Sequence, residues 1–486
     1  MLNCSFQSTG SRRAFTNAQN HPIHMFAANT YTARRERLLK EVDSGLIVLL
    51  GNREVGMNYH ANPYHFRQDS TFLYFFGLQH AGLGALLDAD SGEVTLFGDD
   101  LELDDIVWMG PHPTLIESAV RVGVKNTAAY AEMGKRVQAA KEAGRVVHFL
   151  PPYRYRNMYE LQQWLGIPIE KQKQEASETL IRAVVAQRSI KSEEEVMEME
   201  KALAITRAMH LAVMKGAKPG KTEAQLAAIA EGIALGMNGH LAYPAILTIN
   251  GHILHNHDHS HALQTGQLVL GDFGAETDSC YAGDITRTFP VDGRFTEKQK
   301  EIYQIVLAAE LVGIEACKPG VAYQDVHRKA ARILAEGLAA LGLMKGDLDE
   351  AVAQGAHALF FPHGLGHMIG LDVHDMEDLG EQYVGYSESI HRSDQFGTAY
   401  LRLGRKLEAG FVLTVEPGIY FIPELIDQWQ AERKHWEFIN YEKVQQYRNF
   451  SGIRIEDNVL ITETGHQILG KPIAKTIQEV EAVRQE

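Results

Sequence analysis

A long internal repeat is the feature that most constrains this chain. Residues 214–226 (MKGAKPGKTEAQL) have a counterpart one hundred residues later in residues 314–326 (IEACKPGVAYQDV). In both copies Lys-Pro-Gly ends a long helical pattern, because proline cannot continue the hydrogen-bond ladder and glycine accepts the turn. A second helix follows, then glycine-punctuated β-like segments. We therefore predict a duplicated helix-helix-sheet unit, with a functional site where the two copies meet.

A different pattern precedes the repeat. Apolar strands such as residues 45–50 (GLIVLL) and 145–150 (RVVHFL) alternate with helical stretches, and residues 86–97 predict a hairpin. A capping box formed by Ser192 and Glu195 then starts a new helix. A chain of 486 residues is long enough for about two or three domains.

These boundaries give a predicted tail over residues 1–30, an α/β N-terminal domain over 31–185 and an α+β catalytic domain over 190–486. The tail has no apolar signal region, and its Arg and Ser content faintly resembles a transit peptide. A disordered tail, or an upstream start before Met25, is the preferred interpretation.

The charge balance excludes several classes of partner. Lys+Arg 47 against Asp+Glu 62 gives a net charge of -15, without a basic run for nucleic acid and without an apolar run of the roughly 18 residues that span a membrane. Three scattered cysteines (Cys4, Cys280 and Cys317) suit a reducing compartment. We therefore expect a cytoplasmic protein, with no nucleic acid or membrane as partner.

Two predicted hairpins mark the first half of the repeat. One turns at Asn250-Gly251, and the other has a turn centred near Asp278, which places Asp272 opposite Asp284. Two buried carboxylates so placed would repel each other, so one is protonated or a cation lies between them. Taken alone, the pair also fits a solvated turn that tolerates acids.

Three further segments favour the cation. Glycine-rich residues 360–375 carry His363, His367 and His374, whereas Glu416 and Glu456 each lie in an apolar strand pattern, where a buried acid needs a partner. Four carboxylates and one imidazole balance two divalent ions per subunit. Oxygen-rich ligation favours Mn²⁺, with Co²⁺ or Zn²⁺ as alternatives.

Together, these segments in this order resemble the pita-bread metallopeptidase family of Xaa-Pro aminopeptidases (aminopeptidase P) and prolidases. Residues 66–77 (FRQDSTFLYFFG) likewise resemble the N-terminal domain of aminopeptidase P. The resemblance covers nearly the whole chain and implies a pita-bread catalytic fold and a homodimer or tetramer. One departure is that the two aspartates are twelve residues apart, where the family has eleven.

The resemblance also implies roles for individual residues. Asp272 chelates one metal, His367 and Glu416 hold the other, and Asp284 and Glu456 bridge both. Glu416 also transfers a proton to the leaving nitrogen, and His374 and His363 steady the tetrahedral intermediate. His255 and Arg402 contact substrate, and Arg454 belongs to the hydrogen-bond network around the bridging glutamate and the substrate. All ten positions carry the expected residue type.

The implied activity is hydrolysis of the bond between an N-terminal residue and a following proline. The N-terminal domain favours an Xaa-Pro aminopeptidase. Residues 399–410 and the insertion at 421–450 favour a prolidase instead, in which Arg402 would bind the terminal carboxylate of a dipeptide. A surface role for Arg402 is equally compatible with the sequence. A non-enzymatic pita-bread binding protein is a remote third reading, because it predicts lost ligands.

Five histidines at residues 252–261 raise a separate question. Only His255 is predicted beside the chemistry. The others after it, His257, His259 and His261, are predicted to lie in a solvated connection.

Overall fold

The N-terminal domain is built on a mixed five-stranded sheet. The computed structural model describes residues 26–486, so most of the predicted tail lies outside the described residues. Helix α1 (Ala28–Val42) begins three residues earlier than the predicted domain, and Phe26 is already buried against the core. Residues 26–30 therefore pack as part of this domain.

The sheet has the strand order β4-β3-β2-β1-β5. The predicted hairpin is confirmed, because β2 and β3 pair antiparallel, whereas β1 and β5 pair parallel. The strands are β1 (Leu46–Leu50), β2 (Gly84–Asp88), β3 (Val94–Phe97), β4 (Asn126–Ala128) and β5 (Val147–Phe149). The main helices after α1 are α2 (Ser70–Phe76), α3 (Leu103–Met109), α4 (Leu115–Arg121), α5 (Tyr130–Glu142), α6 (Tyr155–Leu165) and α8 (Glu178–Arg188).

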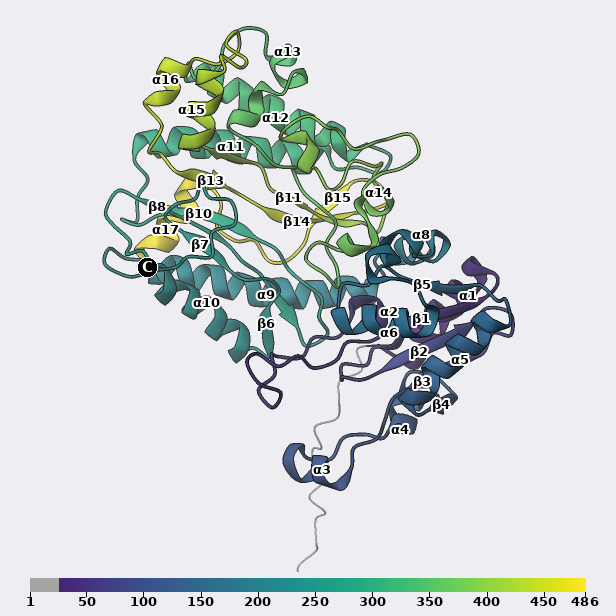
Figure 1. The fold of residues 1–486 in the computed structure, drawn as a ribbon. Coiled ribbons are helices and arrows are strands. Elements are labelled where there is room, and N and C mark those ends of the chain that lie inside the picture. Colours follow the sequence, from purple (N-terminus) through teal and green to yellow (C-terminus); the bar gives the residue numbers. More distant parts are fainter. Residues whose placement is uncertain (1–25) are drawn as a thin grey trace, which may run out of the picture.

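The duplication predicted for the second domain is confirmed by two pairs of long helices. The first pair is α9 (Glu193–Gly216) with α10 (Glu223–Gly236), and the second is α11 (Glu297–Ala316) with α12 (Tyr323–Ala340). Ser192 and Glu195 form the predicted capping box at the start of α9. The two pairs lie on opposite sides of the strands, which occupy the space between them (Figure 1).

The strands of the catalytic domain form small antiparallel sheets in the orders β10-β8-β7, β11-β14-β15, β12-β13 and β6-β9. In the first half they are β6 (Gly239–Leu241), β7 (Ile246–Thr248), β8 (Leu268–Asp272), β9 (Ala275–Thr277) and β10 (Thr286–Pro290). In the second half they are β11 (Val412–Val415), β12 (Gly418–Tyr420), β13 (Gly452–Arg454), β14 (Asp457–Ile461) and β15 (His466–Ile468). The helices α13 (Leu348–Ala353), α15 (Pro423–Ala431), α16 (Tyr441–Gln445) and α17 (Ile477–Gln485) complete the domain.

The hairpin predicted at Asn250-Gly251 is wrong. Strand β7 pairs with β8, and residues 252–261 form a loop rather than a returning strand. A Cβ on Gly251 would lie 2.9 Å from the carbonyl oxygen of Gly452, so this glycine allows a close approach of two backbones.

The register predicted for the second hairpin is also wrong, by two residues. Asp272 pairs with Thr286, not with Asp284. The register differs because strand β9 and the turn after it lie between β8 and β10, where the prediction has a simple turn. In that turn Cys280 adopts a left-handed conformation with a φ of 65°. A shift of two residues keeps the same side chains on the same face, so the two aspartates still converge.

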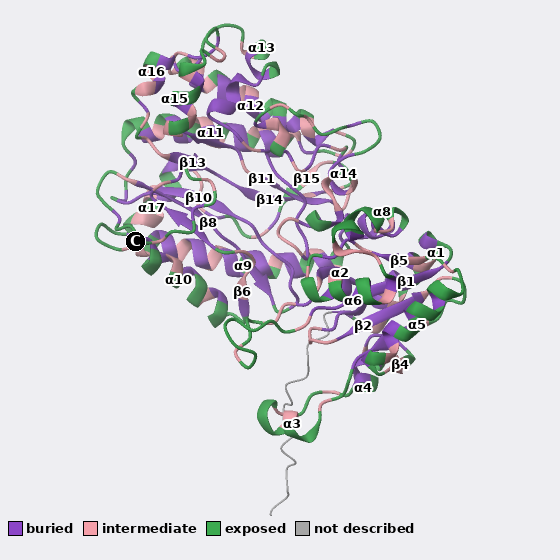
Figure 2. Cartoon of the chain, viewed as in Figure 1, coloured by how far each residue is buried: buried purple, intermediate pink, exposed green. Residues whose placement is uncertain are grey.

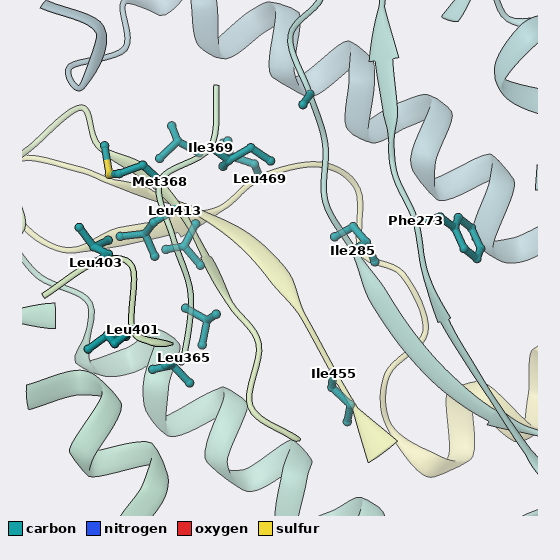
Figure 3. Close-up of a cluster of buried hydrophobic side chains, with 14 of the residues drawn as sticks. Phe273, Ile285, Leu365, Met368, Ile369, Leu401, Leu403, Leu413, Ile455 and Leu469 are labelled. Atoms are coloured by element: carbon teal, nitrogen blue, oxygen red, sulfur yellow. The ribbon is translucent and has the colours of Figure 1, made fainter. Parts of the chain in front are cut away.

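Apolar neighbours fix the direction in which the predicted ligands point. Phe273, Ile285 and Ile455 follow or precede a ligand directly, and all three side chains are buried in the core (Figure 3). Successive side chains of an extended chain point to opposite sides. The core therefore turns Asp272, Asp284 and Glu456 away from itself and toward a common cavity.

Candidate metal centre

The two halves of the duplication supply matching acids. Asp272 ends β8 and Asp284 comes two residues before β10, whereas Glu416 follows β11 and Glu456 comes directly before β14. The halves are joined at this point, because the Glu456 amide donates to the Thr286 carbonyl at 3.1 Å. The predicted meeting point of the two copies is thus where the acids gather.

All five predicted ligands line one cavity of about 710 Å³. Ligand atoms of Asp284, His367 and Glu456 lie within 4.8 Å of one another. His367 Nε2 is 3.4 Å from Asp284 Oδ2 and 3.7 Å from Glu416 Oε1. The side chains of the five predicted ligands therefore converge on one cavity, as the sequence predicts.

Tyr243 is a site residue that the sequence analysis missed. Its hydroxyl oxygen lies 2.6 Å from Asp272 Oδ1 and also contacts Asp284 Oδ1. A single hydroxyl proton cannot serve two carboxylates at once. No motif marks this tyrosine, although its place in the apolar stretch just before β7 puts it opposite the end of β8.

The electrostatics of the cluster favour a bound cation. Burial raises the pKa of the Glu416 carboxyl to about 7, and burial beside Asp284 and Glu416 raises the pKa of Glu456 well above its usual range. Glu456 Oε1 is buried without a hydrogen-bond partner. An unpaired buried oxygen and crowded acids are costly unless a positive charge lies among them, so the residues fit a divalent metal.

A chain of hydrogen bonds surrounds the acids. Arg454 binds Asp272 through Nη2, donates from Nε to Thr286 Oγ1 at 3.1 Å, and Thr286 in turn donates to Glu456 Oε2 at 2.6 Å. Its Nη1 donates to the Tyr420 hydroxyl at 2.9 Å. Arg454 is buried, and all three of its donor groups form hydrogen bonds. It therefore holds the acids in place and does not present a free donor to the cavity.

Backbone pairing positions His367. Thr414 in β11 donates its amide to the His367 carbonyl at 3.0 Å, and the His367 amide donates to Thr414 Oγ1 at 3.1 Å. The neighbouring Gly366 permits this approach, because a Cβ there would lie 2.0 Å from the Thr414 carbonyl oxygen. Nδ1 of His367 is 3.0 Å from the Met368 carbonyl oxygen, which leaves Nε2 toward the acids.

The two other predicted histidines differ in their availability. His374 packs edge-on against the His367 ring at 4.4 Å, and its Nδ1 is 2.6 Å from Glu377 Oε2, so Nε2 is free. His363 has both nitrogens engaged, with the Gly364 carbonyl at 2.8 Å and the Tyr420 hydroxyl at 2.9 Å. His374 alone of this pair presents a free ring nitrogen at the cavity.

The histidine-rich loop divides into two parts. His255 and His257 are exposed and both line the cavity, so the prediction that only His255 lies beside the chemistry is too narrow. His259 Nε2 is 3.1 Å from the Ala245 carbonyl oxygen, and His261 Nδ1 is 3.1 Å from Glu223 Oε2. These last two contacts anchor the loop, while His257, Ser260 and His261 are exposed, as the prediction of a solvated connection requires.

Arg402 lies on the far wall of the same cavity. Its Nη2 is 3.5 Å from Glu377 Oε1, and its buried Nε is 4.0 Å from Glu381 Oε1, too far for a hydrogen bond. Apolar side chains of Phe396, Ile422 and Leu425 continue the wall beyond it. The cavity thus pairs a polar floor of acids with an apolar wall, which is a suitable surrounding for a proline ring.

Two family models match the chain. Metallopeptidase family M24 matches residues 197–463, and the N-terminal domain of aminopeptidase P matches residues 31–148. The chain is 33% identical to the Xaa-Pro dipeptidase of Homo sapiens over 474 residues, covering 95% of this chain and 93% of the other. It is 34% identical to the Xaa-Pro aminopeptidase of Escherichia coli (strain K12) over 473 residues, covering 93% and 97%.

Solved structures agree in fold. Aminopeptidase PepP of Pseudomonas aeruginosa has a TM-score of 0.78 at 28% identity, with 95% of this chain and 99% of the other covered. A zinc-substituted aminopeptidase P of E. coli in complex with product has a TM-score of 0.77 at 30% identity, with 95% and 98% covered. These likenesses confirm the predicted fold class of both domains.

Proposed function

Because the chain belongs to metallopeptidase family M24, we propose that it acts as an Xaa-Pro aminopeptidase that removes the N-terminal residue from peptides with proline second. The observation that carries the proposal is the convergence of four acids and His367 on one cavity with an apolar wall. Curated relatives named for Xaa-Pro bonds support the substrate class. Proline needs a dedicated enzyme because its ring fixes φ and its imide nitrogen carries no hydrogen.

We propose two divalent metals per subunit, Mn²⁺ by preference. Asp272, Asp284, His367, Glu416 and Glu456 would hold them, and the metals, when bound, supply Lewis acidity to polarise the scissile carbonyl and activate a water. Glu416 would also move a proton to the leaving nitrogen, because its carboxylate lines the cavity beside the other proposed ligands. In its doubly protonated form His374 would donate from Nε2 to the reacting carbonyl, while Nδ1 donates to Glu377 Oε2 at 2.6 Å and keeps the ring oriented.

The second candidate function is that of a prolidase, which cleaves Xaa-Pro dipeptides. Arg402 favours it, because a guanidinium on the cavity wall, 3.5 Å from Glu377 and 4.0 Å from Glu381, suits the terminal carboxylate of a dipeptide. The aminopeptidase is favoured by the size of the cavity, about 710 Å³, which leaves room for residues after proline.

The two functions are separated by one comparison. Turnover of Ala-Pro and of Ala-Pro-Ala by the purified manganese-loaded protein is measured side by side, with Arg402→Met as the matched variant. An aminopeptidase prefers the tripeptide and retains that preference in the variant. A prolidase prefers the dipeptide. In the variant this preference is lost, because the KM for the dipeptide rises. Absence of turnover on both peptides would refute both functions.

We also propose a homo-oligomer and a cytoplasmic location. Helix α3 projects from the N-terminal domain and contains no buried residue, and its Val107 and Trp108 side chains are 71% and 86% exposed (Figures 1 and 2). A second copy of the chain would bury these exposed apolar side chains, which supports a homo-oligomer.

The proposed location is supported by the cysteines. Cys280 and Cys317 are free buried thiols, which suits a reducing compartment. Within residues 26–486, no helix is both long and apolar enough to cross a membrane.

A further inference from the structure

The loop of residues 371–375 carries His374 into the cavity, and it is held by side chains of the N-terminal domain and of the connection to α9. The loop contains no helix or strand, and it carries two acids, Asp372 two residues before His374 and Asp375 directly after it. Loops without regular structure open most easily unless something fixes them. What fixes this one is a cluster of charged side chains at the junction of the two domains, in which Arg188, Lys191 and Asp375 are buried.

Arg188, the last residue of α8, is the centre of that cluster. Its Nη2 donates to Asp372 Oδ2 at 2.8 Å and to Asp375 Oδ1 at 2.7 Å, so one guanidinium grips the acids on both sides of His374. Its Nη1 donates to Thr71 Oγ1 in α2 at 2.9 Å. The Arg188 side chain is 3% exposed.

Further hydrogen-bond donors on the same side of the loop also bind residues 371–375. Ser70 Oγ in α2 donates to Asp372 Oδ1 at 2.5 Å, and Lys191 Nζ donates to Asp375 Oδ2 at 2.7 Å. Arg67 Nη2 donates to the Leu371 carbonyl at 2.6 Å. The N-terminal domain and the connection to α9 thus contact the loop at its first, second and last residues.

A buried ionic cluster of this kind adds little to the free energy of folding. Burying charged groups costs free energy that their mutual attraction only partly returns, and apolar replacements of a buried ion pair are often as stable. The cluster does fix the orientation of residues 371–375, because its hydrogen bonds have definite geometry and their partners lie on two domains.

We propose that Arg188, with Ser70 and Lys191, is a positioning residue for the peptidase reaction: it holds residues 371–375 so that His374 keeps its place against His367 and the substrate carbonyl. The proposal rests on the proposed function and assigns to the N-terminal domain a part in catalysis, which it performs through the position of His374. Displacement of a catalytic group by about 1 Å lowers turnover by about 100-fold.

The test compares Arg188→Met, Arg188→Lys and Ser70→Ala. Arg35→Met serves as the matched control, because Arg35 is another buried arginine of the N-terminal domain, bound to the Phe75 and Val122 carbonyls and without contact to residues 371–375. We expect Arg188→Met to lower kcat by about 100-fold with KM and bound metal close to wild type. Lysine should restore part of this loss, because it keeps the charge without the fork, and Arg35→Met should leave kcat unchanged.

Two readouts separate positioning from general damage. Amide hydrogen exchange at residues 371–377 should become faster in Arg188→Met and, by a smaller factor, in Ser70→Ala, a change mild enough to fold. In a His374→Ala background, Arg188→Met should cause no further loss of kcat, because both changes remove the same contribution.

Wild-type kcat in Arg188→Met, independent multiplicative losses in the double variant, or unchanged exchange in Ser70→Ala would each overturn the proposal. If Arg188→Met does not fold, kcat and exchange of Ser70→Ala decide the matter. A wild-type protein without turnover on any Xaa-Pro peptide would refute the proposed function instead, while the exchange measurement would still test the grip on the loop.

Discussion

Replacement of the buried His357 by leucine should make the protein less sensitive to acid. His357 is 2% exposed, neither of its ring nitrogens has a hydrogen-bond partner, and burial lowers its pKa to about 4. A histidine in the unfolded chain has a pKa of about 6.5. Between these values the unfolded chain binds a proton that the folded protein does not bind.

The sign and size of the effect follow from this difference. Because the unfolded state holds more protons, the free energy of unfolding falls as the pH falls from about 6.5 toward 4. With the folded pKa at about 4, His357 alone accounts for a loss of about 2 kcal/mol between pH 7.5 and pH 5. At pH 7.5 the leucine variant should be at least as stable as wild type, because two unpaired polar atoms disappear.

The assay is urea unfolding of wild type, His357→Leu and the control His391→Leu at pH 7.5 and pH 5. His391 is exposed, so its replacement should leave the pH dependence as it is in wild type. The expected result is a difference between the two pH values that is about 2 kcal/mol smaller in His357→Leu than in either other protein. An unchanged pH dependence in that variant would refute the reasoning that His357 folds as a neutral, buried ring.

Three further predictions concern the site. Glu416→Gln should lower kcat by at least about 100-fold at full metal content, since a proton carrier is lost; metal content is measured by mass spectrometry, and undiminished turnover would contradict the role. Removal of divalent metal with a chelator should abolish turnover and lower the melting temperature by at least about 5 °C, because the crowded acids lose their counter-charge; calorimetry before and after Mn²⁺ is returned checks this. His255→Ala should reduce turnover sharply while both metals stay bound, whereas His259→Ala, whose ring only contacts the Ala245 carbonyl, should change neither.

The sequence predicted the site better than it predicted the strands that build it. Local signals such as the capping box at Ser192 and the two Lys-Pro-Gly stops lie within a few residues of what they determine, and they were confirmed. The register of Asp272 was wrong because it depends on β9, a short strand whose partner β6 is remote in sequence. The two aspartates still converged, since an error of two residues does not change the face of a strand.

Contacts between remote segments were beyond sequence reasoning. Tyr243 lies in no motif, and only its meeting with Asp272 and Asp284 gives it a role. Arg188 likewise looks like an ordinary arginine at the end of a helix. Its partners Asp372 and Asp375 follow 184 and 187 residues later in the chain. Patterns within a window of a dozen residues carry no information about such pairs.

The division of the metal centre between the two halves of the catalytic domain has a consequence for biosynthesis. Thr286 and Glu456, which are joined by a hydrogen bond inside the centre, are separated by 170 residues. Pairings of such long range form late, because closure of a large loop must precede them. A ribosome-bound chain that ends before Glu456 lacks one of the proposed ligands, so the complete centre would form only after nearly the whole chain has been released. Divalent metal bound by the proposed ligands would link the two halves and slow unfolding.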